Sequence, residues 1–461
     1  MQDTTTSPQS SGDATQRRGG ARWIERWEPE DAGFWAASGR SVARRNLIFS
    51  IFAEHLGFSV WLLWSIVAVN LKKAGFDFST GQLFWLVAVP NLVGAFLRLP
   101  YTFAVPRFGG RNWTVVSALL LLVPTALLVV AVRNPGTPYW AFVLMAATAG
   151  LGGGNFASSM ANINFFYPER LKGTALGLNA AGGNIGVSVV QLVVPILIVA
   201  GGGIHLARAG YLWAVLAVAA ALCAWFFMDN LSAATSNFRE QITVVRHKHT
   251  WVMSFLYIGT FGSFIGYSAA FPLIIKTQFD GVTVAHYAFL GALVGSIARP
   301  FGGWLSDRVG GARVTFWNFV VMGAGVLLVI NALRVHDFGY FLASFLLMFV
   351  TAGIGNGSTY RMIPVIFQKQ ALVAVSDPGG PDRAAALKTG RREGAAVIGI
   401  ASSVGAFGGF LIPLSYGTWG VVTAFYGFLV FYGICLAVTW WYYTRKRFLA
   451  AQSPSLAHAT I

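Results

Sequence analysis

Two arginines in apolar surroundings are the residues of this sequence with the clearest potential for chemistry. Arg98 stands within Leu92–Thr114 and Arg299 within Leu293–Thr315, and these two segments align without a gap at an offset of 201 residues. Each arginine lies about two helical turns before a basic, glycine-rich loop. A charge at that depth in a membrane span is expensive, about 2.5 to 3.5 kcal/mol, so a matched pair indicates function. We expect the two guanidinium groups to bind one small anion between two related halves.

A structural role for the arginines is the alternative, and it would need buried acidic partners. Among the 17 acidic residues, only Glu54 falls within an apolar stretch long enough to span a membrane. One carboxylate cannot neutralise two buried arginines, and an unpaired buried charge is expensive. The missing counter-charge is therefore predicted to arrive as a bound anion.

Glu54 and His55 are adjacent, about two turns into the first apolar stretch. Either group titrates near neutral pH after a modest shift, so the pair is a candidate proton carrier. Glu54 is equally well explained as a fixed counter-ion to one of the paired arginines or to Arg361. Arg361, towards the end of the tenth apolar stretch, is expected to reach the lipid headgroups or to form part of an inner gate.

The composition is that of a chain that crosses a membrane many times. The 461 residues are 55% hydrophobic and 11% charged, with a mean hydropathy of +0.60. The formal net charge of +16 follows the topology, because most lysines and arginines fall in the tails and in alternate connections. This distribution indicates that both termini are cytoplasmic, and it makes nucleic-acid binding unnecessary as an explanation. The twelve stretches long enough for a bilayer of about 30 Å are 47–71, 81–105, 113–132, 139–166, 173–200, 209–228, 251–276, 285–306, 313–333, 338–367, 394–414 and 420–444.

The twelve stretches divide into two sets of six, separated by a polar segment. Arg22–Ser38 is both aromatic and charged, which favours a position at the cytoplasmic headgroup boundary. Gln368–Gly394 has no apolar period and is predicted to be a mobile cytoplasmic loop. The predicted domains are a cytoplasmic tail with this interfacial aromatic segment (1–45), a first six-helix bundle (46–228), a cytoplasmic linker (229–250), a second six-helix bundle (251–444) and a cytoplasmic tail (445–461).

Glycine is concentrated in the fourth, fifth and tenth stretches. The repeat continues there, since Thr148 and Gly150 match Thr351 and Gly353 at an offset of 203 residues. Glycines let membrane helices approach closely and slide, as two rocking halves require. The glycines to which we assign this role are Gly152, Gly153, Gly154, Gly182, Gly183, Gly353, Gly355 and Gly357.

The loop after the eighth stretch contains the pattern GxxxDRxGxxR, formed in part by Gly303, Asp307 and Arg308. It resembles the cytoplasmic loop signature of the major facilitator superfamily. Pro106 stands where the first copy would have the aspartate, so that copy is degraded. We expect these loops to clamp neighbouring helix ends in one conformation. Ordinary positive loops would explain the arginines but not the spacing of Gly and Asp.

The segment Gly150–Pro168, GLGGGNFASSMANINFFYP, resembles the nitrate signature of the nitrate/nitrite porter family. Gly353–Phe367 is similar to the second signature of that family, and Trp27–Trp35 is similar to its N-terminal segment. The resemblance runs from Trp27 to the last apolar stretch. It implies an all-α membrane protein with twelve transmembrane helices in two pseudo-symmetric six-helix halves, the major facilitator fold, that moves nitrate and nitrite.

The resemblance also implies which residues bind the substrate. The guanidinium fork suits nitrate, because it donates two parallel hydrogen bonds to one edge of a planar anion. Some members look like proton symporters and others like nitrate/nitrite exchangers, so both modes stay open. The paired arginines of the family fall on Arg98 and Arg299, and its lining positions fall on Phe156, Asn184, Tyr257 and Phe261.

Other classes of function have less support in the sequence. No His/Cys/Asp/Glu cluster has metal-ligand spacing and no phosphate-binding loop occurs, so we expect no metal, no cofactor and no enzymatic activity. The alternatives are a transporter of the same fold for another small or organic anion, and a nitrate receptor without transport. The receptor is disfavoured because no sizeable extramembrane domain is present. We expect a monomer in the cytoplasmic membrane, with nitrate, nitrite and lipid as its partners.

Overall fold

The computed structural model of the chain describes residues 17–18, 22–234, 243–373, 382–446, 455–459 and 461. Within these ranges the chain is almost entirely helical, and eleven helices are long and apolar enough to cross a membrane. The bent pair Ala32–Trp61 and Leu63–Asn70, whose axes meet at 42°, provides the twelfth span. The prediction of an all-α membrane protein with twelve spans is therefore confirmed.

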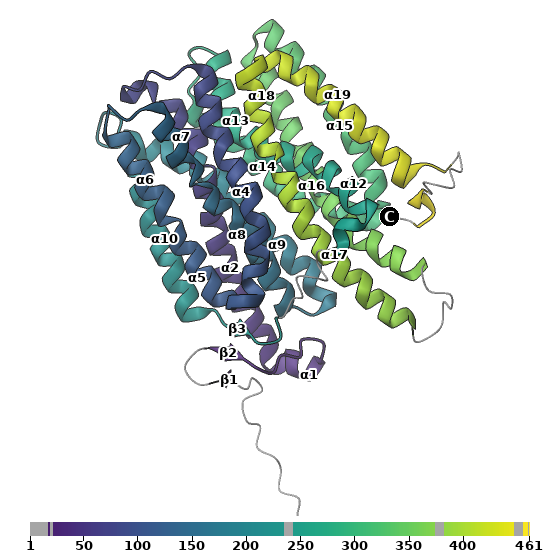
Figure 1. Cartoon of the computed structure of the whole chain (residues 1–461). Helices are drawn as coiled ribbons and strands as arrows, with labels where there is room; N and C mark the ends of the chain where they lie inside the picture. The colour runs from purple at the N-terminus through teal and green to yellow at the C-terminus, as the bar shows by residue number, and fades with distance from the viewer. Residues whose placement is uncertain (1–16, 19–21, 235–242, 374–381, 447–454, 460) are drawn as a thin grey trace, which may run out of the picture.

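The first six spans form one bundle, coloured from purple to teal in Figure 1. Three of these spans are divided into two consecutive helices. The helices are α2 (Arg40–Trp61) with α3 (Leu63–Val67), α4 (Thr80–Phe108), α5 (Gly110–Leu120) with α6 (Leu122–Arg133), α7 (Tyr139–Ala147) with α8 (Gly150–Phe166), α9 (Glu169–Val199) and α10 (Ala207–Phe227).

The second six spans form the other bundle, coloured from teal-green to yellow, beside the first (Figure 1). They are α12 (Lys248–Tyr257) with the π-helix η5 (Ile258–Gly262) and α13 (Ser263–Gln278), α14 (Ala288–Val309), α15 (Gly311–Val335), α16 (Phe338–Val373), α17 (Asp382–Ala406) with α18 (Gly408–Trp419), and α19 (Val421–Thr439) with η7 (Trp440–Thr444). The remaining short helices are α1 (Ala32–Phe34), η1 (Trp35–Gly39), η2 (Ala68–Asn70), η3 (Lys72–Ala74), η4 (Val244–Arg246), η6 (Val284–His286) and η8 (Leu456–Ala459).

Helices α4 and α14 end in the same way, which makes the sequence repeat visible in the backbone. α4 is followed by Gly109 with φ of +88°, and α14 by Gly310 with φ of +96°. Glycine adopts a positive φ without strain. The next helix begins immediately in both halves, at Gly110 and Gly311. The two turns are therefore equivalent at the offset of 201 residues that relates the paired arginines.

The two halves meet along a few helices. α4 packs against α17 and α18, α9 packs against α14, and α3 packs against α13. Within the halves, α8 packs against α4 and α16 packs against α14, which are equivalent pairs. Arg98 on α4 and Arg299 on α14 therefore both lie on helices that contact the opposite half.

The connection between the tenth and eleventh spans differs from the predicted mobile loop. α16 continues to Val373 and α17 begins at Asp382, so residues 368–373 and 382–394 are helical. This stretch is rich in Ala, Lys, Arg and Glu, which favour helix even where no apolar face has to be buried. Residues 374–381 of the predicted loop lie outside the described residues.

The segment before the first span is folded against the end of the bundle. The strands β1 (Arg17–Arg18), β2 (Trp23–Ile24) and β3 (Asn230–Leu231) form a sheet in that order, antiparallel and then parallel. Trp27 is buried in a cluster that includes Phe166 at the end of α8. Its indole nitrogen donates to the carbonyl oxygen of Phe165 at 3.2 Å. Protein packing therefore accounts for this tryptophan, while the position of the segment at the headgroups stays a prediction.

Candidate functional site

Arg98 lies in the interior of α4 and is fully buried. Its Nε donates to the carbonyl oxygen of Gly153 on α8 at 3.2 Å, and its Nη1 donates to the carbonyl oxygen of Ser402 on α17 at 3.1 Å. Its Nη2 is buried as well and has no hydrogen-bond partner. One arginine therefore contacts both halves and keeps one nitrogen available as a donor.

Three aromatic rings surround the Arg98 guanidinium. Its Cζ lies 4.7 Å from the ring centroids of Phe156 and Phe261, and 5.1 Å from the ring of Trp61. Aromatic faces at this distance attract a cation, most strongly when the cation is desolvated. The structure places the two predicted phenylalanines, one from each half, on the same arginine. It adds Trp61 of α2, which the sequence motifs do not mark.

Arg299 lies on α14 and is 6% exposed. Its Cζ is 5.6 Å from the ring centroid of Phe156 and 5.6 Å from that of Tyr360 on α16. Its Nη1 is buried and has no hydrogen-bond partner. The structure therefore brings Arg98 and Arg299 to the same ring, Phe156, from opposite halves.

Neither arginine forms an ion pair with an acidic side chain in the described part of the chain. Glu54 of α2 is fully buried and lies close enough to both arginines to interact electrostatically. Its Oε2 accepts a hydrogen bond from Asn179 Nδ2 of α9 at 2.5 Å, while its Oε1 has no partner. The same Nδ2 donates to Ser159 Oγ at 2.6 Å. Glu54 is therefore held by an amide from α9 and not by a direct arginine contact.

The predicted glycines lie where helices approach one another most closely. A Cβ atom on Gly153 would lie 2.8 Å from the Cα of Gly94, and one on Gly183 would lie 2.3 Å from Glu54 Oε1. His55, next to Glu54, has its Nδ1 3.1 Å from the carbonyl oxygen of Gly182. This shows close helix packing, while sliding stays a prediction. A Cβ would also come within 3.0 Å of another residue at Gly152, Gly154, Gly182, Gly353, Gly355 and Gly357.

Tyr257 and Phe261 are placed by the change from α-helix to π-helix at the start of η5. The ring of Phe261 is stacked on Phe156 at 6.1 Å and on Tyr257 at 5.3 Å. The Tyr257 hydroxyl donates to Asn356 Oδ1 of α16 at 2.8 Å. π-Helical turns inside α-helices occur frequently at functional sites. This one aligns three aromatic rings in a column that passes beside Arg98.

Asn184 of α9 is 1% exposed, and both of its amide atoms lack a hydrogen-bond partner. A buried amide without partners is costly. No hydrogen bond joins it to the other predicted site residues in the described ranges. Its role in substrate binding therefore stays a prediction, which its unpartnered amide supports.

A cavity of about 100 Å³ begins beside the paired arginines. Phe156, Tyr360 and Ser402 line it next to the site, and Pro106 of α4 and Phe165 of α8 line it farther away. Pro106 and Phe165 both lie near the helix ends that carry the N-terminal segment. The cavity therefore runs between the halves from the arginine pair towards that end of the bundle.

On the other side of the arginines, hydrogen bonds join the two halves. Ser403 Oγ of α17 donates to the carbonyl oxygen of Ala95, one turn before Arg98 on α4, at 2.6 Å. On α9, Ser188 Oγ donates to the carbonyl oxygen of Phe289 at 3.1 Å. Gln191 Nε2 donates across the interface to the carbonyl oxygen of Ser268 at 2.8 Å. These three contacts, called the seal below, join the halves on the side opposite the cavity.

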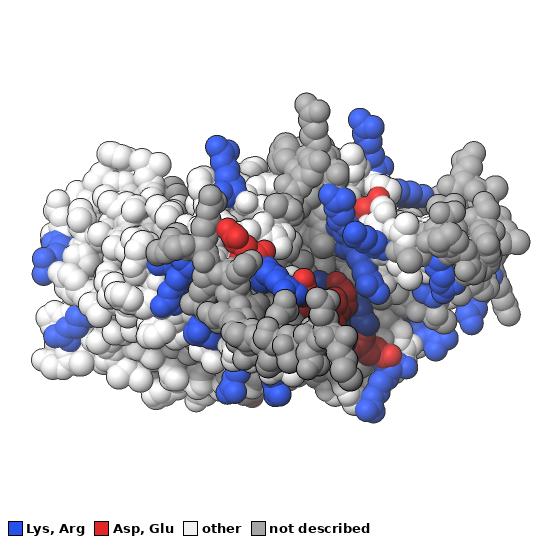
Figure 2. All heavy atoms as spheres, turned by 90° about the horizontal axis from the view of Figure 1, so that it is seen from below, with Lys and Arg blue, Asp and Glu red and all other residues white. Residues whose placement is uncertain are grey.

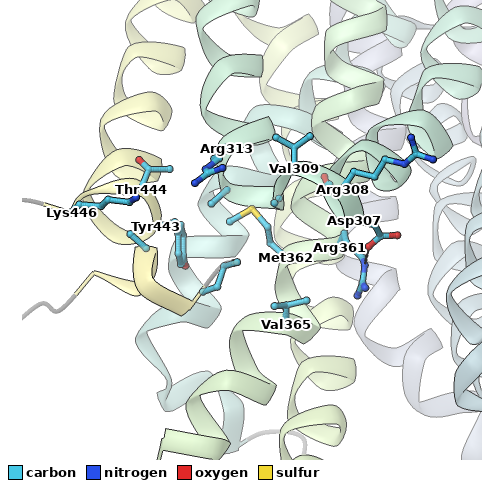
Figure 3. Close-up of a pocket in the computed structure, with 16 residues that line it drawn as sticks. Asp307, Arg308, Val309, Arg313, Arg361, Met362, Val365, Tyr443, Thr444 and Lys446 are labelled. Atoms are coloured by element: carbon cyan, nitrogen blue, oxygen red, sulfur yellow. Dashed lines mark hydrogen bonds and ion pairs between the residues drawn. The ribbon is translucent and has the colours of Figure 1, made fainter.

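The loop motif is separate from the arginine pair. Asp307 at the end of α14 forms an ion pair with Arg361 of α16. The acidic partner of Arg361 is therefore Asp307 and not Glu54. The Arg308 Cζ lies 4.2 Å from the Trp304 ring. Gly303 has no atom of another residue near its Cβ position, so its place in the motif is not explained by close packing. Asp307, Arg308 and Arg361 line a second cavity of about 490 Å³, together with residues of α15, η7 and the C-terminal segment (Figure 3).

Two six-helix halves with one buried arginine from each half at their interface define a multi-span membrane transporter. The comparisons with known proteins agree. Residues 47–376 match the Major Facilitator Superfamily. The chain therefore belongs to the Major Facilitator Superfamily. Relatives named as nitrate/nitrite transporters or antiporters are 39 to 44% identical to it over 91 to 94% of its length, so within the superfamily it belongs to the nitrate/nitrite porter family.

Two relatives and one solved structure are similar to the chain over most of its length. The nitrate/nitrite transporter NarU of Escherichia coli is 43% identical over 94% of this chain and 99% of its own length. The probable nitrate/nitrite antiporter NarK2 of Thermus thermophilus is 39% identical over 92% of this chain and 97% of its own length. The crystal structure of the human organic anion transporter MFSD10 has the same fold, with a TM-score of 0.57 and 14% identity over 87% of this chain and 99% of its own.

Four residues at the site were not predicted individually. Tyr360 and Asn356 lie within Gly353–Phe367, so the second signature contained a signal for them. Ser402 takes part through its backbone carbonyl, which residue type does not reveal. Trp61 is placed by the contact of α2 with α4, where its indole nitrogen donates to the carbonyl oxygen of Pro90 at 2.9 Å.

Proposed function

We propose that the protein is a secondary active transporter that carries nitrate and nitrite across the cytoplasmic membrane by alternating access. The observation that carries this proposal is the pair Arg98 and Arg299. They are buried on opposite halves, each has a nitrogen without a partner, and neither forms an ion pair with an acid within the described residues. Unpaired buried charge is expensive, so a bound anion completes the site. Relatives named as nitrate/nitrite transporters support these two substrates.

The chemistry of the site suits a small, flat, monovalent anion. Guanidinium groups donate in a plane, as the edge of nitrate or nitrite requires. Phe156 and Phe261 supply flat faces beside these donors, which suits a planar anion better than a tetrahedral or strongly hydrated one. Phosphate and sulfate carry more charge than nitrate and require a different arrangement of donors. The selectivity we propose therefore comes from plane, size and charge together.

We propose that both termini lie in the cytoplasm. The face seen from below in Figure 2, which carries the N-terminal segment, shows many more Lys and Arg than Asp and Glu. This agrees with the rule that cytoplasmic connections are rich in positive charge. With this orientation, the cavity beside Phe156 faces the cytoplasm and the seal at Ser403 faces the outside. The protein described here is then in an inward-facing state, and a monomer contains both halves of the site.

We propose exchange of nitrate for nitrite as the mode of transport. An empty site leaves two like charges at one interface, and bringing them closer without an anion is unfavourable. A bound anion removes that repulsion and favours the closed intermediate, so that the conformational change follows occupancy. Proton symport is the second candidate, because Glu54 is buried close to both arginines and its Oε1 has no partner.

Reconstituted protein in liposomes tests the proposal and separates the two modes. Labelled nitrate is supplied outside, with nitrite, nitrate or only chloride inside, and each condition is repeated with an inward proton gradient. Exchange predicts uptake that requires internal nitrite or nitrate and that the gradient does not drive. Uptake that requires the gradient and no internal substrate would assign symport. No uptake of either ion under any condition would contradict the proposed function.

A further inference from the structure

Asn356 of α16 is a buried amide with only one of its two ends occupied. It is fully buried, and its Oδ1 accepts the hydrogen bond of the Tyr257 hydroxyl at 2.8 Å. Its Nδ2 is buried too and has no hydrogen-bond partner. An unsatisfied buried donor is costly and calls for an explanation. A ligand that accepts hydrogen bonds would satisfy this donor.

The surroundings of Asn356 define what such a ligand would be. Tyr360 lies one helical turn further along α16, on the same face, and touches Arg299. Tyr257 is stacked on Phe261, which touches Arg98. Arginine side chains only donate hydrogen bonds, so neither arginine can satisfy an amide N–H. An anion between the arginines can satisfy all three donors at once.

In the structure, Tyr257 occupies one end of the Asn356 amide. A phenolic hydroxyl both donates and accepts, whereas the two ends of an asparagine side chain do only one each. With the Tyr257 hydroxyl donating to Oδ1, the Nδ2 group with its two N–H donors is left unoccupied. In this arrangement the donor end of the amide is available to a ligand.

We propose that Asn356 is a further anion-binding residue, whose amide nitrogen donates to the bound oxyanion while Tyr257 holds its carbonyl oxygen. The inference rests on the proposed function and deepens it. Three nitrogens without partners, Arg98 Nη2, Arg299 Nη1 and Asn356 Nδ2, then meet an anion that has three acceptor oxygens in the case of nitrate. Arg299 and Asn356 both belong to the second half, so that half supplies two of the three donors. The two arginines alone would supply one donor from each half.

Calorimetric titration of nitrate into the purified full chain tests this inference. Asn356→Leu removes the donor, and Asn356→Asp keeps the shape of the side chain but replaces the donor by an acceptor. We expect Asn356→Leu to weaken nitrate binding by about tenfold, the effect of one hydrogen bond to a charged group. We expect Asn356→Asp to weaken it further. The matched control is Asn318→Leu, a buried amide of α15 whose Nδ2 donates to Met322 Sδ at 3.3 Å, which should change affinity by less than about twofold.

The results can overturn the inference in two ways. Affinity like the wild type in Asn356→Leu, or a milder effect of Asp than of Leu, would assign Asn356 a role in shape only. The second test repeats Asn356→Leu in a Tyr257→Phe background. We expect a further loss there that is smaller than about tenfold, because the amide has lost the hydrogen bond that orients it, whereas no further loss would show that Asn356 acts only through Tyr257.

The wild-type titration separates failure of this inference from failure of the proposed function. A wild-type protein that binds nitrate, with variants that bind it equally well, would overturn the inference alone. A wild-type protein that binds no nitrate would overturn the proposed function and the inference with it.

Discussion

The guanidinium groups of Arg98 and Arg299 lie against the same aromatic ring. The Cζ atoms are 4.7 Å and 5.6 Å from the centroid of Phe156, although the two arginines come from opposite halves of the molecule. Phe156 itself belongs to α8 of the first half, so the second half meets the first through its arginine. This arrangement couples the position of each arginine to the relative position of the halves. In the proposed mechanism, anion binding and the movement of the halves would therefore both involve the Phe156 ring.

Replacement of Phe156 should weaken anion binding through both arginines. Phe156→Leu keeps the apolar volume but removes the two cation–π contacts, together about 1 to 2 kcal/mol, which corresponds to roughly fivefold to thirtyfold in affinity. Titration calorimetry with nitrate measures the change. The control is Phe58→Leu, because Phe58 meets Phe156 edge-on at 6.0 Å. Equal effects of the two substitutions would show that general packing, and not the arginine contacts, is what Phe156 provides.

Two glycines, one from each half, should respond differently to alanine. Gly153→Ala places a Cβ 2.8 Å from the Cα of Gly94, so we expect a loss of about 1 to 3 kcal/mol in stability. Gly303→Ala meets no atom within 4 Å and gains helix propensity, so we expect no loss and up to about 1 kcal/mol of gain. Thermal unfolding in detergent compares them. Similar midpoints for both variants would contradict the close packing of α4 and α8.

The seal opposite the cavity should weaken when Ser403 loses its hydroxyl. One hydrogen bond contributes about 0.5 to 1.5 kcal/mol. Ser403→Ala should therefore raise the population of the outward-facing state, relative to the inward-facing state, by roughly twofold to tenfold. The probe is Ser268→Cys in a chain with Cys223 and Cys435 replaced, because the Ser268 carbonyl lies at this seal. The cysteine at position 268 should react faster with a membrane-impermeant thiol reagent when Ser403→Ala is present than in the parent chain.

Ser415→Ala is the control for that experiment, since its hydroxyl donates to Ile412 within its own helix at 2.7 Å. It should leave the labelling rate unchanged. If both serine variants label at the rate of the parent chain, the Ser403 contact does not hold the halves together.

Substitution of Glu54 tests exchange against symport. Glu54→Gln preserves the acceptor for Asn179 Nδ2 and removes the titratable group. Exchange predicts nitrate/nitrite counterflow within about threefold of the wild type, and an unchanged dependence on pH. Uptake rates measured between mildly acidic and mildly alkaline pH decide the question. A proton-driven component present in the wild type and absent in Glu54→Gln would assign Glu54 to proton coupling.

Much of the fold was predictable because the chain repeats itself. The alignment of Arg98 with Arg299 also aligns the positive-φ glycines Gly109 and Gly310. The helices α4 and α14 therefore end at equivalent positions of the repeat. Apolar stretches long enough to cross a bilayer give the number of spans with little ambiguity. The arginine pair was predictable for the same reason, since a buried charge is rare enough to notice.

What the sequence could not predict depends on contacts between distant segments. Ser402 accepts from Arg98 across 304 residues of sequence through a backbone atom, which no residue pattern reveals. In the sequence, Trp61 cannot be distinguished from the other apolar residues of its span. In the structure, its ring packs on Gly94 and Gly153, which have no side chain, and therefore lies beside Arg98. The sequence predicts a loop at 382–394 because periodicity detects an apolar face, whereas this part of α17 packs on α16 through the glycines Gly390 and Gly394.

The most direct test of the central claim is nitrate/nitrite counterflow in proteoliposomes with Arg98→Lys, Arg299→Lys and the double variant. Lysine keeps the positive charge and removes the planar fork, so each single variant should exchange at least about tenfold more slowly than the wild type, and the double variant should not exchange measurably. Thermal unfolding in the same detergent confirms that the variants are folded. A double lysine variant that exchanged nitrate for nitrite at the wild-type rate would contradict the account.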